Sequence, residues 1–150
     1  MTLAHAVREK HESGIEKCRM IDFPRVAERR GNLSFIESGK HVPFEIKRVF
    51  YVYDIPTGEK RGAHAHRDLE EVVLCLSGGL DVVLNDGRET KVVHLNRPNR
   101  GLYIPRLIWT NMENFYPNTV YVVLASTHYN EKDYIRDYDD FLEISGGNHQ

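Results

Sequence analysis

The sequence predicts an all-β fold, a sandwich or barrel of antiparallel strands, followed by one short helix. Short runs rich in β-branched and aromatic residues recur along most of the chain at intervals of about 8–12 residues, and clusters of Gly, Pro, Asn and Asp separate them. Over residues 131–143 the apolar side chains change from strand spacing to helical spacing. Together these observations indicate many short strands in one domain and a helix near its carboxyl end.

The predicted strands follow a polar segment. Residues 1–19 are polar and charged, so we expect them to form an extension, with one domain over residues 20–144 and a tail over residues 145–150. The runs IDF and LSFIE are predicted as short strands around the turn signal Arg30-Gly31-Asn32. The run FEIKRVFYVYDI, residues 44–55, is the longest strand candidate.

Seven further strands are predicted after the break at Pro56-Thr57-Gly58. In chain order they are AHAH, EVVLCLSG, LDVVLND, TKVVHL, GLYIP, IWTNM and TVYVVLAS. Asn85-Asp86-Gly87 lies between two of them and is a strong hairpin signal, because these residues tolerate positive φ angles. The helix over 131–143 is predicted from the spacing of five apolar side chains, Tyr134, Ile135, Tyr138, Phe141 and Leu142.

Composition and charge exclude several classes of protein. Of the 150 residues, 41% are hydrophobic and 28% are charged, as in a globular domain. The net charge of −2 and the pI of about 6.4 provide no electrostatic reason for binding nucleic acid or an anionic membrane. No apolar run approaches the ~18 residues of a membrane span. Cys18, expected at the surface, and Cys75, expected to be buried, are too few for a disulfide framework. We therefore expect a cytoplasmic protein with neither a nucleic-acid nor a membrane partner.

The most informative local pattern is Gly58-x5-His64-x-His66-x4-Glu71-x6-Gly78. Two histidines at positions i and i+2 of a strand point to the same face, and a carboxylate across the next turn can reach the same space. Two imidazoles and a carboxylate can bind a divalent metal. They can equally transfer protons without a metal, because an imidazole titrates near neutral pH.

This spacing resembles the first sequence motif of the cupin superfamily, whose fold is a jelly-roll barrel. The second cupin motif supplies a further histidine, and the corresponding stretch here is GLYIPRLIWTNM, with Thr110 at the histidine position. A threonine hydroxyl is a poor ligand for a divalent transition metal. The expectation is therefore an antiparallel jelly-roll barrel that holds no metal and no other cofactor.

A longer resemblance covers residues 21–141. The segments that carry it are RGNLSFIE, PFEIKRVFYVYD, RGAHAHRDLEEVVLCLSG, LNDG, GLYIP and VVLASTHYNEKDYIRDYDDF. They are similar to the sugar 3,4-ketoisomerases of the WxcM-like cupin group. The resemblance implies an enzyme that converts dTDP-4-keto-6-deoxyglucose into a 3-keto sugar, for later amination to the 3-amino sugars of surface polysaccharides or antibiotics. It also implies a metal-independent homodimer with exchanged N-terminal strands.

The chemistry of that reaction suggests roles for several side chains. A base must remove the C3 proton, which lies α to the C4 ketone, and a donor must stabilise the enediolate. The resemblance assigns catalysis to the HxH pair, and we predict His66 as the C3 base and His64 as its partner or as a donor that orients the substrate. Tyr53 and Tyr51, two apart on one face of a strand, are predicted to relay a proton or hold a sugar hydroxyl, or else to be packing residues.

Further residues are predicted to bind the substrate. Arg61 and Arg48 can each hold a diphosphate oxygen through the planar guanidinium, or be ordinary solvated arginines. Tyr103 and Trp109 can stack on thymine or the sugar, or belong to the core. Two more candidates depart from the family: Thr110 replaces a histidine in a W-H-E-M stretch, and Glu71 stands where the family tends to have glutamine.

Three alternatives stay open at this point. Related cupins epimerise sugar nucleotides at C3 or C5, and the keto position of the product distinguishes that reaction from ketoisomerisation. A non-catalytic sugar-nucleotide-binding protein would retain its binding without His66. A metal-dependent cupin oxygenase would purify with stoichiometric iron or manganese. The spacing of residues does not determine which face of the enediolate is protonated at C4, nor which nucleotide base is bound.

Overall fold

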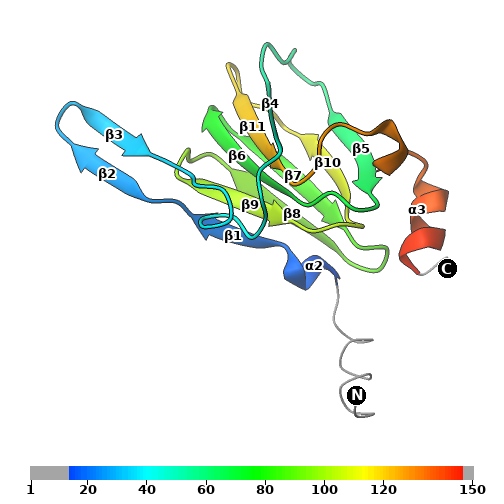
Figure 1. Ribbon diagram of the computed structural model, residues 1–150. Helices are drawn as coiled ribbons and strands as arrows, with labels where there is room; N and C mark the ends of the chain where they lie inside the picture. Colours follow the sequence, from blue (N-terminus) through cyan, green and yellow to red (C-terminus); the bar gives the residue numbers. More distant parts are fainter. Residues whose placement is uncertain (1–13, 147–150) are drawn as a thin grey trace.

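The computed structural model describes residues 14–146, and within them the strands form two facing antiparallel sheets of five strands each and a separate hairpin (Figure 1). The first sheet has the order β1 (Arg19–Asp22), β9 (Arg100–Ile104), β6 (Glu71–Ser77), β11 (Val120–Ala125) and β4 (Arg48–Val52). The second has the order β12 (Tyr134–Ile135), β5 (Arg61–His66), β10 (Trp109–Glu113), β7 (Leu80–Asn85) and β8 (Thr90–Leu95). The predicted all-β, antiparallel jelly roll is confirmed.

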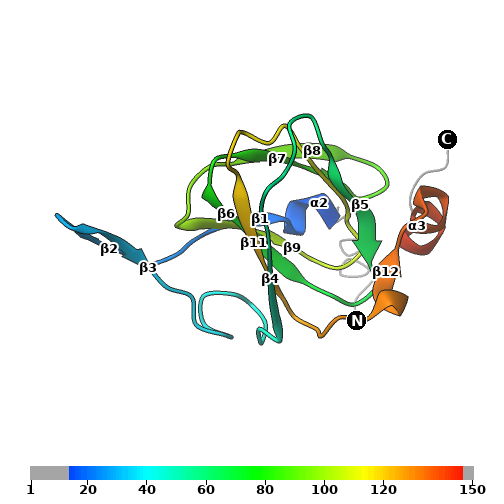
Figure 2. The ribbon, with the colours of Figure 1, turned by 90° about the horizontal axis from the view of Figure 1, so that it is seen from above.

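A hairpin and three helical segments complete the fold. The hairpin of β2 (Arg25–Glu28) and β3 (Gly31–Ser34) projects from one side, and α3 (Tyr138–Ser145) lies on the opposite side (Figure 2). The other two are α2 (Gly14–Lys17) and the 3-10 helix η1 (Glu131–Asp133). Every predicted strand run overlaps an observed strand. The strand before the turn at Arg30-Gly31-Asn32 is β2, however, because the run IDF belongs to β1, which pairs with β9. The longest candidate, residues 44–55, is a strand only over Arg48–Val52, and Asp54, with φ of 55°, turns the chain away from strand geometry.

The main core lies between the two sheets. Side chains that alternate along the strands form this core. Along β7, Leu80, Val82 and Leu84 are buried, whereas the residues between them are less buried. Burying such side chains stabilises a fold by about 1.5–3 kcal/mol each. Two core members come from the segment that the sequence predicted as a polar extension, because Ile15 of α2 and Cys18 are both buried here. The prediction of a surface position for Cys18 is wrong; residues 1–13 of that extension lie outside the described residues.

The outer face of the first sheet is covered as well. Strand β6 lies at the centre of this sheet, and its first five residues are all buried, which explains why EVVLCLS reads as a continuous apolar run. Val72 and Leu74 of β6 pack outward against Phe23, Val42 and Phe44. The long connection before β4 thus forms a second layer, and β6 is held on both sides.

The C-terminal helix is shorter than predicted. The helix expected over 131–143 is correct only from Tyr138, and the preceding residues form η1 and the two-residue strand β12, which pairs with β5. Asp137 is the N-cap, and its side chain accepts a hydrogen bond from the Asp140 amide. The apolar spacing of this segment fits one long helix, but pairing with β5 and the cap at Asp137 favour a strand followed by a short helix.

The turn between β6 and β7 depends on a glycine. Gly78 has φ of +78°, and a Cβ there would lie 2.8 Å from the Thr119 Cα. Gly58 has a similar φ of +84° with no atom within 4 Å of such a Cβ. The two positions therefore separate backbone strain from crowding.

We predict that Gly78→Ala lowers the free energy of unfolding more than Gly58→Ala does. Left-handed strain costs about 1–2 kcal/mol at either position. Crowding against Thr119 adds roughly 1–3 kcal/mol only at Gly78. Urea unfolding of both variants at one protein concentration measures the difference, and equal losses would contradict the role given to the close approach.

Candidate active site

A cavity of about 260 Å³ opens between the two sheets. The first sheet supplies five of its lining residues, namely Phe50, Val52, Glu71, Tyr121 and Val123. The second sheet and the residue after β12 supply Arg61, Gly62, His64, Thr110, Met112, Tyr134 and Arg136. The lining combines an apolar wall with a histidine, a carboxyl group and two arginines. Such convergent polar groups in an otherwise apolar cavity are typical of a small-molecule site.

Close packing of β5 on β10 determines where the histidine lies. The register of this pair shifts between Thr110 and Asn111, opposite Gly62. A Cβ on Gly62 would lie 2.7 Å from the Thr110 carbonyl oxygen, and its φ is +92°. Only glycine fits this contact, and the irregularity directs the side chain of His64 into the cavity.

His64 is the histidine that lines the cavity. Its ring lies against the rings of His66, at 5.0 Å between centroids, and Tyr134, at 5.2 Å. Burial, followed by the neighbouring His66, lowers the pKa of His64 to about 4. The imidazole is therefore neutral at neutral pH and able to accept a proton.

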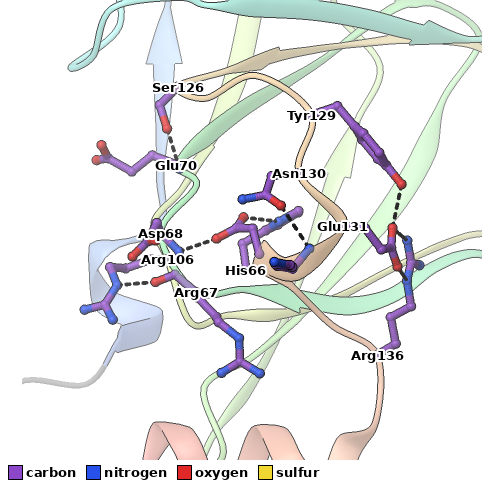
Figure 3. A network of polar contacts seen from close by, with 12 residues as sticks. His66, Arg67, Asp68, Glu70, Arg106, Ser126, Tyr129, Asn130, Glu131 and Arg136 are labelled. Carbon is purple, nitrogen blue, oxygen red and sulfur yellow. Dashed lines mark hydrogen bonds and ion pairs between the residues drawn. The ribbon is translucent and has the colours of Figure 1, made fainter.

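His66 lies behind His64 and does not line the cavity. Its Nδ1 lies 2.9 Å from Asp133 Oδ2, and the other carboxylate oxygen accepts a 2.7 Å hydrogen bond from the Asp68 amide (Figure 3). Both side chains are buried. Burial lowers the pKa of His66, although the bond to Asp133 opposes this. The carboxylate holds the imidazole with Nδ1 as donor, which leaves Nε2 free to accept.

Glu71 presents a buried carboxyl group to the cavity from the opposite sheet. Its side chain is 5% exposed and, within the described part of the chain, has neither a hydrogen bond nor an ion pair. Burial raises the pKa of Glu71 to about 7, against the opposing effect of the Arg48 guanidinium and with a smaller rise from Asp133. Near neutral pH this group is thus present both as an acid and as a carboxylate.

Arginines occupy two different places around the cavity. Arg61 and Arg136 line it; Arg61 Nε donates to the Tyr121 hydroxyl at 3.3 Å, and Arg136 is paired with Glu131 at 2.7 Å (Figure 3). Arg48 is not part of the lining; its guanidinium lies over the rings of Phe50 and Tyr129, and its Nε is buried with no hydrogen-bond partner among residues 14–146. Its positive charge acts on both Glu71 and His66.

The structure brings together four of the predicted site residues and keeps six outside the lining, Arg48 and His66 among them. Arg61, His64, Glu71 and Thr110 share the cavity. Tyr51 and Tyr53 are 63% and 59% exposed, because the inward positions of β4 belong to its alternate residues, Phe50 and Val52.

Two further aromatic candidates also lie outside the cavity. Tyr103 lies on the outer face of the first sheet, where its hydroxyl donates to Glu70 and the Arg19 guanidinium lies over its ring. Trp109 is buried beneath α3, against Tyr138 and Phe141. In a single chain, neither ring can stack on a ligand in this cavity.

No set of three His, Cys, Asp or Glu side chains among residues 14–146 is arranged to hold a metal ion. His66 uses Nδ1 for Asp133, and the Thr110 hydroxyl donates to the Ile108 carbonyl at 3.3 Å. The described helices are all too short or too polar to cross a membrane.

Sequence reasoning missed the segment that completes the site. Asp133, Tyr134 and Arg136 were all placed on the predicted helix over 131–143, whereas η1 and β12 bring them to His64 and His66. The available signal was Asp137-x-x-Asp140, an N-cap pattern that starts the helix later. Pairing between β12 and β5 is non-local and leaves no such signal.

Comparisons with known proteins agree with this geometry. The family model described as FdtA, WxcM-like, C-terminal, matches residues 16–146. A TDP-4-oxo-6-deoxy-α-D-glucose-3,4-oxoisomerase of Aneurinibacillus thermoaerophilus is 44% identical over 82% of this chain and 88% of its own length. Two solved structures of 3,4-ketoisomerases are also similar to this chain.

A 3,4-ketoisomerase from Helicobacter canadensis is 46% identical, with a TM-score of 0.84 over 86% of this chain and 97% of that one. A mutant of the 3,4-ketoisomerase from Thermoanaerobacterium thermosaccharolyticum, in complex with TDP-4-keto-6-deoxyglucose, is 38% identical, with a TM-score of 0.84 over 85% of this chain and 93% of that one. These likenesses cover most of the chain and agree with a cupin-type fold.

We predict that Glu71→Gln raises the free energy of unfolding at pH 8 but not at pH 4. The folded-state pKa of Glu71, about 7, lies above its ordinary value of 4.5, so ionisation favours the unfolded chain as pH rises from 4.5 to 7. Above that window the gain is on the order of 3 kcal/mol. Below pH 4.5 the carboxyl is protonated in both states and the difference vanishes.

Urea unfolding of the wild type and the variant at both pH values, at equal protein concentration, tests this. Glu143→Gln, which changes an exposed carboxylate on α3, is the matched control and should show little pH-dependent difference. A Glu71→Gln effect that is the same at pH 4 and pH 8 would contradict the raised pKa.

Proposed function

The chain belongs to the FdtA family, described as WxcM-like, C-terminal, and on that premise we propose that it is a TDP-sugar 3,4-ketoisomerase. The reaction moves the keto group of TDP-4-keto-6-deoxyglucose from C4 to C3. The observation that supports it best is the neutral, cavity-lining imidazole of His64, backed by a second imidazole that a buried carboxylate holds. The 3-keto product is suited to an aminotransferase that makes a 3-amino sugar.

His64 is the base in this proposal. It removes the C3 proton, which the adjacent C4 ketone acidifies, and the resulting enediolate takes a proton at C4. This assignment differs from the order expected from the sequence, in which His66 was the C3 base, because His64 lines the cavity and His66 does not. The Asp133-held His66 is a positioning residue that packs against His64 and Tyr134.

The diphosphate needs cationic groups at the cavity. Arg61 and Arg136 supply them, and the planar guanidinium can bind phosphate oxygens in a bidentate manner. Arg61 has only one hydrogen bond to a side chain, to Tyr121, among the described residues, so most of its donors remain available. Binding of a TDP-linked sugar is thus compatible with the charges in the lining.

Proton NMR in D2O with TDP-4-keto-6-deoxyglucose and a 3-aminotransferase as trap tests the proposed function. A 3-amino sugar that carries deuterium at C4 is the expected product, and the C4 coupling constant also gives its stereochemistry. Inversion at C3 or C5 with the ketone still at C4 would instead identify an epimerase. Substrate that binds without any exchange at C3 would contradict catalysis altogether.

We expect His64→Asn to abolish product formation and C3 exchange, because it removes the base. His66→Asn should lower kcat by about 10–100-fold while C3 exchange stays measurable, since outer contacts of this kind contribute that much. The same NMR assay separates the two variants. Equal and complete loss in both, with TDP binding retained, would assign the base to the pair rather than to His64.

We further propose that two chains form a homodimer through exchange of the N-terminal hairpin. Residues of β2 and β3 are all exposed, and the hairpin projects from the barrel (Figures 1 and 2). An isolated two-stranded hairpin is at best marginally stable in water. Beside it, an apolar cavity of about 260 Å³ lies on the outer face of the first sheet, lined by Phe23, Ser34, Phe35, Ile36, Leu74, Leu76, Pro98, Val122 and Leu124. A second copy of the hairpin region would cover these surfaces.

A cytoplasmic location fits the two free thiols, Cys18 and Cys75.

Leu33→Glu should convert the dimer into a monomer, because it places a charge on an apolar hairpin side chain that is 58% exposed in one chain. Val92→Glu is the matched control: Val92 has the same exposure but lies on β8, away from the hairpin. Light scattering coupled to size exclusion measures both masses. A wild-type monomer, or equal effects of the two substitutions, would contradict this interface.

A further inference from the structure

Of the two arginines that line the cavity, Arg136 is held more firmly. Its Nε donates to Glu131 Oε1 at 2.7 Å, and its Nη2 donates to Glu131 Oε2 at 3.1 Å (Figure 3). The guanidinium also lies over the Tyr134 ring, 4.3 Å from its centroid. One edge and one face of the planar group are therefore fixed, the edge by a carboxylate and the face by an aromatic ring.

We propose that Glu131 is a positioning residue for substrate binding, which holds Arg136 at the cavity with the other edge of its guanidinium available to the diphosphate. This inference rests on the proposed function, in which Arg136 binds the diphosphate of a TDP-sugar. Glu131 itself does not line the cavity, so its effect on the ligand passes through Arg136.

The geometry of the guanidinium allows both partners to bind together. Its five N–H donors form two edges, and each edge can bind two oxygens at once. Glu131 occupies the edge formed by Nε and Nη2. Because Nη2 carries two hydrogens, the edge formed by Nη1 and Nη2 can still bind two phosphate oxygens. Glu131 therefore does not have to leave Arg136 when the substrate binds.

The Glu131 carboxylate is itself held by its neighbours. The Tyr129 hydroxyl donates to Glu131 Oε2 at 2.6 Å, and the Arg48 guanidinium lies over the Tyr129 ring, 5.5 Å from its centroid. Glu131 also begins η1, so a capped helical turn fixes its backbone. The hydrogen bonds from Arg136 and Tyr129 hold the pKa of Glu131 well below its ordinary value. Glu131 therefore remains a carboxylate at any pH near neutral.

A role in folding stability does not explain this arrangement. The Glu131 and Arg136 side chains are each 54% exposed, and an exposed ion pair contributes little to the free energy of unfolding. An arginine that is already ordered, however, loses less conformational freedom when a ligand binds, and this raises the affinity. A second ion pair, between Lys60 and Glu113 at 3.5 Å, involves no residue of the lining and provides a comparison.

Glu131→Gln tests the proposal, because glutamine has nearly the same size but cannot accept both hydrogen bonds from Arg136. The Kd of TDP, measured by isothermal titration calorimetry at fixed ionic strength, should rise about 2–10-fold, the range for ordering a long side chain on binding. The KM for TDP-4-keto-6-deoxyglucose should rise by a similar factor, while kcat and the urea midpoint change little. Glu113→Gln, which removes the same charge from the Lys60 pair, should leave the Kd and KM unchanged.

A double-mutant cycle shows whether Glu131 acts through Arg136. Arg136→Met removes the guanidinium, so adding Glu131→Gln to it should weaken TDP binding no further. Unchanged or tighter TDP binding by the Glu131→Gln single variant would overturn the proposal, and the tighter binding would identify Glu131 as a competitor of the diphosphate. A further loss of affinity in the double variant would also overturn it. A wild type that does not bind TDP would overturn the proposed function, and this inference with it.

Discussion

The contact between His66 and Asp133 holds the site together. These residues are 67 positions apart, and their 2.9 Å contact, together with the Asp68 amide, joins the end of β5 to the segment that contains η1 and β12. Backbone bonding supports the same junction, since the Arg67 amide donates to the Asp133 carbonyl. Tyr134 and Arg136 line the cavity because these contacts hold their segment against β5. A buried carboxylate left without the imidazole would be costly, so the pair constrains both the fold and the chemistry.

Burial then acts in opposite directions on the ionisable groups of the cavity. It disfavours the charged form of each, so the pKa of His64 falls to about 4 and that of Glu71 rises to about 7. A base and an acid are thus available together between these values. Arg48 moderates the effect, because its positive charge favours the Glu71 carboxylate and opposes protonation of His66. The reactive state of the site therefore follows from the low polarity of the space between the sheets.

The sequence is most informative where structure is local. Strand positions follow from apolar runs and turn residues. Of the pattern around His64, His66 and Glu71, the first and the last residue line the cavity. Period-two spacing shows that Tyr51 and Tyr53 share a face of the strand. Which face points inward depends on pairing with β11, which is distant in the sequence. The same limit applies to β12, whose partner β5 cannot be read from a segment that also has helical periodicity. Non-local pairing decides these cases, and it has no local signature.

Thr110 and Glu71 are best understood together. They face one cavity from opposite sheets, and each differs from what the resemblance leads one to expect at its position. Thr110 has lost an imidazole that could exchange protons, and its hydroxyl is turned to the Ile108 carbonyl. Glu71 adds a carboxyl that can exchange them, in surroundings that keep it largely protonated below pH 7. Groups able to exchange protons therefore remain on both walls of the cavity, His64 on the sheet of Thr110 and Glu71 on the facing sheet.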